Sequence, residues 1–377
     1  MTTKKTTLLI LAAALLIAIA AGCSPAQKPE NTTPQQQGTT PAQQPGNTTA
    51  QQPENNSESY VFTDSAGRDV TLPRNIESVA PTGPLSQIVL FALCPDKLAG
   101  LASWFGDDQS EYLDGKYLSL PVFGNFYSDT LNLESVLLAA PQVIIDIGEV
   151  KPNNNDDLDG ISDRTGIPTI FIQMDLGSIL TAFETLGMIT GETEQAERLI
   201  GYISKTLSET EQKLSTIPES SRFSIYYGQD DGLTAVVSGS IHADVVDLAG
   251  GVNVAAVEAT GRSGTAMISP EQLILWDPDV ILFAPGSVYG EAASLPEWSG
   301  LRAIKEGMFY EIPNGPYNWM GRPPSVNRIL GIKWLSNLLY PDVFGYDMAA
   351  EAREFYRLFY HCELTDAQIG ALLRNSG

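Results

Sequence analysis

The sequence of 377 residues contains very few cysteine, histidine and basic residues. Three cysteines are too few for a disulfide scaffold, and two histidines cannot supply a metal site with several imidazole ligands. Only 22 Lys and Arg residues stand against 45 Asp and Glu, which gives a net charge of −23. Such acidity argues against nucleic acid or an anionic membrane surface as the partner and leaves a basic protein surface as a suitable one.

Motifs of common enzyme classes are also absent. The sequence has no G-x-x-x-x-G-K-[ST], G-x-G-x-x-G, H-E-x-x-H, G-x-S-x-G or C-x-x-C. A Ser-His-Asp assembly would have to use His242 or His361. His361 ends an amphipathic helical pattern, where packing or C-capping is the expected role, whereas His242 follows a Ser-Gly-Ser segment and has ligand contact as an alternative role. We predict a non-enzyme without a cofactor and without a metal site.

The first 22 residues have the features of an export signal. Lys4 and Lys5 precede an apolar run of about 14 residues, which is too short to span a bilayer comfortably. Small residues then lead into Cys23, a pattern that resembles the bacterial lipoprotein cleavage box, in which the cysteine becomes the lipidated first residue. The alternative is an ordinary signal peptide with an incidental cysteine. The lipoprotein interpretation implies an extracytoplasmic protein that reaches the membrane only through its lipid anchor.

Residues 23–59 predict a disordered tether. Six prolines and eight glutamines lie between residues 24 and 59, and such a segment cannot bury enough apolar surface to fold. After it, short apolar runs alternate with helical patterns in residues 60–177 and again in 218–377, which is typical of α/β layers with parallel strands. Residues 178–217 lack proline and carry apolar residues at helical spacing, which predicts a connecting helix with one break near Thr190-Gly191.

One sequence unit occurs in both halves at matched spacing. Glu134 lies seven residues before Pro141, Glu271 lies seven before Pro278, and each proline precedes an apolar strand that runs into a glycine-bearing loop. Each unit predicts a helix, a proline turn and a buried strand. We therefore expect an α/β fold with two pseudo-symmetric lobes joined by one long helix, and a ligand beyond the carboxyl ends of the strands.

These features together resemble the substrate-binding proteins of ABC importers for iron-siderophore complexes, haem and vitamin B12, the class III periplasmic binding proteins. The resemblance covers about residues 60–375 and includes the Gly250-Gly251-Val252-Asn253 segment and the W-M-G-R-P-P-S segment at 319–325. It implies a monomer with a rigid connecting helix that delivers a small ligand to an ABC permease dimer with its ATPase. A cell-surface sensor or interaction domain with the same fold is the alternative from a different class.

The resemblance also implies where the permease docks. In the family, one acidic residue on each lobe pairs with permease arginines, and the matching residues here are Glu134 and Glu271. Exposed carboxylates suit a transient encounter with a basic partner. The alternative is that each glutamate only stabilises the positive N-terminus of its own helix, and the two roles can coexist.

Aromatic residues, arginine and asparagine gather in loops that follow predicted strands. Rings supply contact area for a bulky ligand, and a guanidinium supplies planar donors for an anionic one. Core packing is the alternative role for the rings, and bracing of the 319–325 loop is the alternative for Arg322. The predicted ligand contacts are Trp104, Tyr227, Arg262, Tyr289, Tyr317, Trp319 and Arg322.

The predicted ligand is an iron complex of the ferric siderophore type. An iron chelate brings its own iron ligands and requires from the protein mainly cationic donors and aromatic walls, whereas a bare transition-metal ion would need several imidazole ligands. Cobalamin is an alternative because Trp319 and Arg262 match residues of the vitamin B12 binders, although their second tryptophan is absent from residues 263–268. Haem is a further alternative, and so is a tetrahedral oxyanion such as molybdate or tungstate, which donor-rich loops such as Thr82-Gly83-Pro84 could hold.

Two features have more than one interpretation. Cys94 and Cys362 fit either two separate thiols, which we favour, or a disulfide. Acidic residues within 155–163 match the first nine positions of an EF-hand, but Gly166 stands where the bidentate glutamate is required. A helical pattern is also predicted over 156–165, and we expect a solvated acidic loop that caps a helix rather than a calcium site.

Overall fold

The computed structural model describes residues 58–261 and 264–377, which belong to one compact unit. The predicted export signal, Cys23 and nearly all of the tether lie outside the described residues, as does Arg262. Within the described ranges, no helix is long and apolar enough to cross a membrane. The predicted two-lobed body is thus described almost completely.

The first lobe is built on a parallel sheet with the strand order β3-β4-β5. Side chains of the buried central strand alternate between its two faces: Ile145 and Ile147 join the main core with α1, and Ile144 joins a smaller core with α4 and α5. Helices therefore cover both faces of the sheet. The elements are β1 (Ser59–Thr63), β2 (Asp69–Pro73), β3 (Val79–Pro81), α1 (Pro84–Leu93), α2 (Asp107–Ser110), α3 (Gly115–Leu118), α4 (Leu133–Ala139), β4 (Val143–Gly148), α5 (Asn154–Thr165) and β5 (Thr169–Gln173).

Helix α5 contains the acidic segment that we expected to be a loop. Leu158 and Ile161 are buried one helical turn apart, and Gly166 ends the helix in the left-handed conformation with a φ of 68°. Helical geometry spreads the acidic side chains around the helix axis instead of converging them on one point. The helix predicted over 156–165 is therefore confirmed, whereas the expectation of a loop at 155–163 was wrong.

The connecting segment consists of two helices, α6 (Ile179–Thr190) and α7 (Thr193–Leu214). They separate at Gly191, whose φ of 74° is the left-handed conformation that glycine adopts without steric cost. The long helix α7 buries an apolar stripe that includes Leu199 and Ile203, and both residues belong to the main core. The connecting helix is therefore packed along its length.

The second lobe has a mixed sheet with the strand order β11-β10-β6-β7-β9, and β8 pairs with β6. Strands β11, β10, β6 and β8 pair in parallel with one another, whereas β7 is antiparallel to both β6 and β9. The elements are β6 (Ser224–Gln229), β7 (Thr234–Val236), α8 (Asp244–Leu248), β8 (Val252–Asn253), β9 (Thr265–Met267), α9 (Pro270–Trp276), β10 (Val280–Phe283), α10 (Pro296–Ser299), α11 (Arg302–Lys305) and β11 (Phe309–Glu311).

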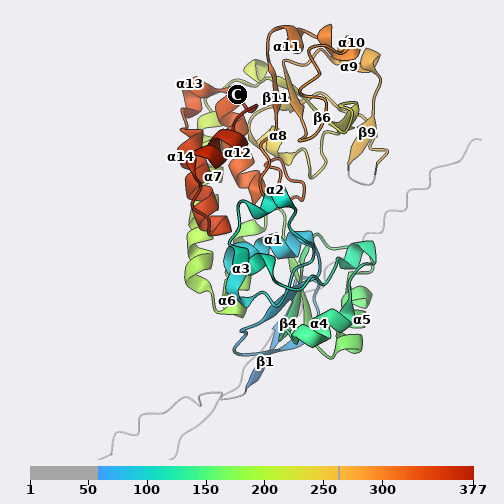
Figure 1. The fold of residues 1–377 in the computed structure, drawn as a ribbon, viewed down its shortest axis with the longest axis vertical. Helices are drawn as coiled ribbons and strands as arrows, with labels where there is room; N and C mark the ends of the chain where they lie inside the picture. Colours follow the sequence, from blue (N-terminus) through green and yellow to red (C-terminus); the bar gives the residue numbers. More distant parts are fainter. Residues whose placement is uncertain (1–57, 262–263) are drawn as a thin grey trace, which may run out of the picture. The chain divides into compact units, whose positions relative to one another are not determined.

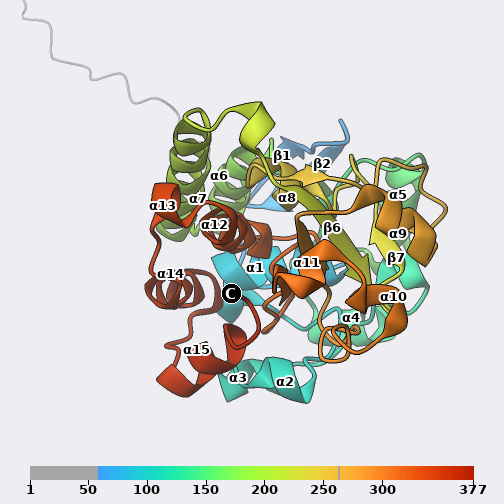
Figure 2. The ribbon, with the colours of Figure 1, turned by 90° about the horizontal axis from the view of Figure 1, so that it is seen from above.

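The C-terminal helices pack beside α7 and against the first lobe. Figures 1 and 2 both show α12 next to α7, α14 packs against α12, and the Phe355 ring of α14 lies 6.0 Å from the Tyr202 ring of α7. The imidazole Nε2 of His361 lies 3.2 Å from the Phe91 carbonyl oxygen in α1, so the end of the chain contacts the first lobe. The elements are α12 (Asn327–Leu339), α13 (Pro341–Phe344), α14 (Met348–Phe355) and α15 (Asp366–Leu372).

The two cysteines of the described residues are separate free thiols. Cys94 is buried at the end of α1, and burial raises the pKa of its thiol to about 12. A thiol with such a pKa is protonated at neutral pH and behaves as a small apolar side chain.

Candidate ligand-binding cleft

A cavity of about 240 Å³ lies at the carboxyl ends of the three strands of the first lobe. Residues 83–86 follow β3, Asp146 to Glu149 end and follow β4, and Met174 follows β5. The second lobe closes this cavity with Ile241 and Pro324. It therefore lies between the lobes, in the position where open α/β sheets bind ligands.

Asp146 is a buried carboxylate at the end of β4, with an exposure of 1%. It accepts hydrogen bonds from the hydroxyls of Thr82 and Tyr127, one on each carboxylate oxygen. Burial raises the pKa of the Tyr127 phenol, and the nearby Asp146 charge raises it further. Tyr127 is therefore a neutral donor that holds the carboxylate in place.

Lys151 places a cation beside these groups. Its ammonium nitrogen lies 3.0 Å from the centroid of the Tyr127 ring, a cation–π contact. Burial lowers the pKa of Lys151, while the charges of Asp146, Asp157 and Glu149 act in the opposite direction. The cavity wall of the first lobe thus carries both signs of charge.

The N-terminus of α1 borders the same cavity. Gly83 is its N-cap and Pro84 its first residue; its first turn has no acidic residue, and among the described residues no side chain caps it. Since first-turn N–H groups lack partners within a helix, this end carries a partial positive charge toward the cavity. Glycine at position 83 also permits a close approach, because a Cβ there would lie 3.2 Å from Oδ1 of Asn125.

The second lobe adds another helix N-terminus near the cavity. Pro324 lines the cavity two residues before Val326, the N-cap of α12, and the first turn of α12 also has no acidic residue. Arg322 is exposed and donates a hydrogen bond to Gln229. His242 Nδ1 lies 2.9 Å from the Gly321 carbonyl oxygen, and burial lowers the pKa of this imidazole.

An ion pair with a buried arginine connects two helices on this side of the second lobe. The Arg328 guanidinium is 1% exposed and lies 2.9 Å from the Asp244 carboxylate. Burial lowers the pKa of Arg328, whereas Asp244 and the first-lobe residues Asp175 and Glu149 raise it. The ion pair thus joins the first residue of α8 to the first turn of α12.

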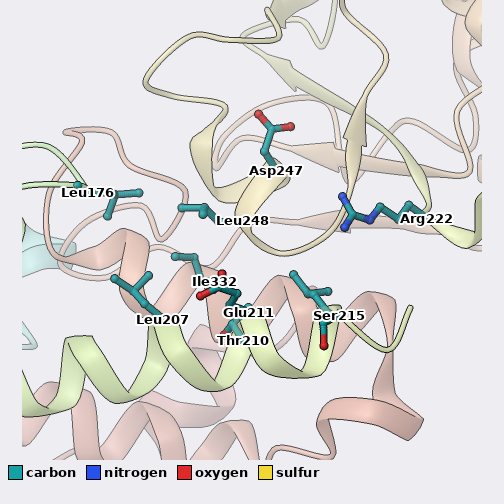
Figure 3. A pocket seen from close by; sticks show the side chains of 11 residues that line it. Leu176, Leu207, Thr210, Glu211, Ser215, Arg222, Asp247, Leu248 and Ile332 are labelled. Carbon is teal, nitrogen blue, oxygen red and sulfur yellow. The ribbon is translucent and has the colours of Figure 1, made fainter. Parts of the chain in front are cut away.

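A larger cavity of about 600 Å³ lies between α7 and α8 (Figure 3). In Figure 3, Leu207 and Ile332 lie on the α7 and α12 side, and Leu248 faces them from α8. Arg222, Glu211 and Asp247 form its polar part. This cavity runs along the connecting helix and does not reach the ends of β3 and β4. We therefore place the candidate ligand site in the smaller cavity.

The residues predicted as ligand contacts lie in different environments. Trp104 is 68% exposed and follows Ser103, whose backbone N–H donates to the Gln87 side chain of α1 at 3.0 Å. Arg322 is exposed in the 319–325 segment, and Arg262 lies outside the described residues. Among the described residues, Trp104 and Arg322 are thus the predicted contacts with the most exposed side chains.

Of the four other predicted rings, three are buried and Tyr289 is partly buried. Trp319 is 1% exposed and its indole N–H donates to the Tyr356 hydroxyl at 3.3 Å, while the Tyr317 hydroxyl accepts a hydrogen bond of 3.3 Å from Gln87. Tyr227 is fully buried in β6. Tyr289 is partly buried and packs against Phe283 and Phe309 at the edge of the smaller core of the second lobe. None of these rings lines the cavity of 240 Å³.

Asp146, Tyr127 and Lys151 were not predicted from the sequence as site residues. Asp146 carried a usable signal, because it interrupts the apolar strand Val143 to Ile147, and a charge in a buried strand needs polar partners. Tyr127 and Lys151 had no such signal, since their proximity depends on the folded loops.

Glu134 and Glu271 occupy equivalent exposed positions. Each lies in the first turn of its helix, α4 or α9, behind a side-chain N-cap, Asn132 or Ser269. Hydrogen bonds from its own backbone N–H and from Ser269 lower the pKa of Glu271. The arrangement fits a helix-stabilising role and leaves both carboxylates accessible.

Residues 88–316 match the family model of the periplasmic binding proteins. An ABC transporter solute-binding protein from Sulfurospirillum deleyianum DSM 6946 is similar, with 28% identity, a TM-score of 0.76, and coverage of 83% of this chain and 99% of that chain. A periplasmic solute-binding protein from Veillonella parvula DSM 2008 has 27% identity, a TM-score of 0.70, and coverage of 84% and 97%.

A third solved structure shares the fold at lower identity. The molybdate periplasmic binding protein MolA of Haemophilus influenzae, bound to molybdate, has 21% identity, a TM-score of 0.67, and coverage of 81% of this chain and 99% of that chain. Among curated proteins, none matches this chain.

Proposed function

The chain belongs to the periplasmic binding protein family, and we propose that it captures an oxygen-rich anionic solute in the cavity between its lobes. The members of this family are extracytoplasmic solute-binding proteins and not enzymes. They deliver a small molecule to an ABC permease. The observation that carries the proposal is the position of the α1 N-terminus, without an acidic first turn, at the cavity wall. Lys151 adds a full positive charge at the same wall.

The size of the cavity favours a compact anion. A volume of about 240 Å³ is below the usual range of about 300–1,000 Å³ for pockets that hold drug-sized ligands. A tetrahedral oxyanion such as molybdate or tungstate fits such a volume and accepts hydrogen bonds from backbone N–H groups. Asp146 opposes an anion, but hydrogen bonds from Thr82 and Tyr127 offset part of its charge.

A ferric siderophore is the second candidate. The observation that favours it is the accessible Trp104 ring, because an exposed tryptophan supplies contact area for the organic part of a chelate. Arg322 adds an accessible guanidinium. Both candidates share anionic oxygen atoms, and they differ in the size of the group that surrounds them.

Titration calorimetry of the protein distinguishes the candidates. Molybdate, tungstate, a ferric hydroxamate, a ferric catecholate, haem and cobalamin are titrated separately. We expect an oxyanion to bind, and we expect Lys151→Gln to weaken binding by about tenfold because a charged hydrogen-bond partner is lost. Lys116→Gln is the matched control, since Lys116 is an exposed lysine paired with Asp96 away from this cavity. Binding of cobalamin alone, or equal affinity of both variants, would contradict the proposal.

We also propose that Cys23 carries a lipid and that Glu134 and Glu271 contact the permease. The sequence pattern before Cys23 and the exposure of both glutamates support these assignments. Labelling with radioactive palmitate tests the anchor, because Cys23→Ala should abolish the label. A sensor domain of the same fold would bind its ligand but would not support uptake through a permease.

A further inference from the structure

Helices α4 and α9 each expose a pair of large aliphatic side chains. On α4, Leu137 and Leu138 are 45% and 89% exposed; on α9, Ile274 and Leu275 are 59% and 78% exposed. Single exposed aliphatic residues are common on protein surfaces, but adjacent pairs with such exposure cost solubility. The exposure of these two aliphatic pairs therefore needs a physical explanation.

The two pairs occupy the same place in two equivalent structural units. Counted from Glu134 or Glu271, the residue two positions later is buried, Val136 or Leu273, and the aliphatic pair stands three and four positions later. Residues three and four apart in a helix share one face. Each glutamate and its aliphatic pair therefore form one exposed surface, and we name these surfaces the α4 face (Glu134, Leu137, Leu138) and the α9 face (Glu271, Ile274, Leu275).

The rest of each unit is also equivalent. Both helices have seven residues and end in a residue with positive φ, Ala140 at 48° and Asp277 at 40°. A buried proline then leads into β4 or β10, each of which lies between two other strands of its sheet. Figure 1 labels α4 on the first lobe and α9 on the second. The chain thus presents the same surface chemistry twice.

We propose that the α4 and α9 faces dock on the two subunits of the ABC permease and that the aliphatic pairs, rather than the glutamates, hold the complex together. This inference rests on the importer function of the family and goes beyond the docking role of the glutamates. A surface that is repeated on two lobes suits a partner with two equivalent subunits. Within the described residues no ion pair involves Glu134 or Glu271, so both remain available to a basic partner.

The glutamate and the aliphatic pair of each face affect different steps of binding. Exposed charges accelerate association and orient the partner, and salt screens their effect. Buried aliphatic contacts control dissociation and are much less sensitive to salt. Variants of the glutamates and variants of the aliphatic pairs should therefore differ in their kinetic signatures.

Surface plasmon resonance with the permease–ATPase complex of the same cell in nanodiscs tests this division. Leu137→Ser with Leu138→Ser, or Ile274→Ser with Leu275→Ser, should weaken binding by about tenfold or more through faster dissociation, at low and high salt alike. Glu134→Gln with Glu271→Gln should slow association and reduce the salt dependence. Met188→Ser is the matched control, because Met188 is 64% exposed on α6, outside both faces, and this variant should bind normally.

Four outcomes would contradict the proposal. Unchanged dissociation of both serine variants would overturn it, and so would an equal loss in Met188→Ser. Self-association of the wild type that the serine variants abolish would identify a second copy as the occupant, and binding to empty nanodiscs would identify lipid. The single variants Leu138→Ala and Leu275→Ala, with thermal melting, show whether folding is retained. Molybdate and ferric-chelate titrations of the same variants separate this result from a failure of the ligand proposal.

Discussion

Tyr127 and Tyr117 each donate a hydroxyl hydrogen bond to an aspartate, but the two aspartates differ in burial. Tyr127 donates to Asp146, which is 1% exposed, and Tyr117 donates to Asp96 at 2.9 Å, whose side chain is 76% exposed. Water can replace the lost partner of Asp96 but has little access to Asp146. The same hydrogen bond therefore contributes more to stability at Asp146 than at Asp96.

We expect Tyr127→Phe to lower the free energy of unfolding by about 1–3 kcal/mol, because it leaves a buried carboxylate oxygen without its donor. Tyr117→Phe, the matched control, should cost about 0.5 kcal/mol or less. Urea unfolding followed by circular dichroism measures both values. Equal losses in the two variants would mean that water reaches Asp146 as readily as Asp96.

The sequence could not decide which aromatic side chains face the cleft. Tyr317, Trp319 and Trp104 all stand in loops, and nothing in their local patterns separates them. Their burial depends on distant partners: Tyr317 meets Gln87 of α1, and Trp319 meets Tyr356 near the end of the chain. The residue type showed that these side chains offer a large contact area. Whether that area faces a ligand or the core depends on tertiary packing.

The helix α12 lies unusually close to the loop that carries Trp319. A Cβ built on Gly331 would lie 2.0 Å from the Trp319 carbonyl oxygen, which is a backbone atom that cannot rotate away. Gly201 is also a helical glycine, on α7, but a Cβ there would meet nothing within 4 Å. Substitution of these two glycines by alanine therefore distinguishes the effect of close packing, at Gly331, from the effect of intrinsic helix propensity, at Gly201.

Gly331→Ala should destabilise the protein by about 1–3 kcal/mol or more, because the helix must move away from the loop. Gly201→Ala should instead stabilise it by about 0.5–1 kcal/mol, since alanine is the better residue in a helix interior. Thermal melting of the two variants checks the signs. A stabilising effect of both substitutions would show that the contact between α12 and the loop adapts freely.

Repeated units were the elements most accessible to prediction. The matched spacing of Glu134 and Glu271 predicted two helix, turn and strand units, and the structure has α4 with β4 and α9 with β10 at these places. Strands β7 and β9 have three residues each, and such short runs do not reveal antiparallel pairing. The acidic segment 155–163 misled because alternate carboxylates resemble a metal loop, while the buried Leu158 and Ile161 have helical spacing.

At the scale of the whole molecule, one hydrophobic core extends through both lobes. It includes Ile145 of the first sheet, Leu199 of α7, Leu282 of the second sheet and Phe355 of α14. The side-chain amide of Gln195 on α7 donates at 3.0 Å to the carbonyl oxygens of Ala92 in α1 and of Leu358. The C-terminal segment, which the sequence placed with the second lobe, therefore also supports the first.

This shared core predicts that the lobes unfold together. Calorimetry should show one transition in which the calorimetric and van't Hoff enthalpies agree, because neither lobe retains a complete core alone. Gln195→Ala should lower the free energy of unfolding by about 1–3 kcal/mol, since one buried and one partly buried carbonyl group lose their donor. It should shift the whole transition, whereas Gln212→Ala at an exposed site of α7 should leave it in place. Two separate transitions, only one of which moves in Gln195→Ala, would mean that the lobes are stable independently and that α7 joins two domains rather than one core.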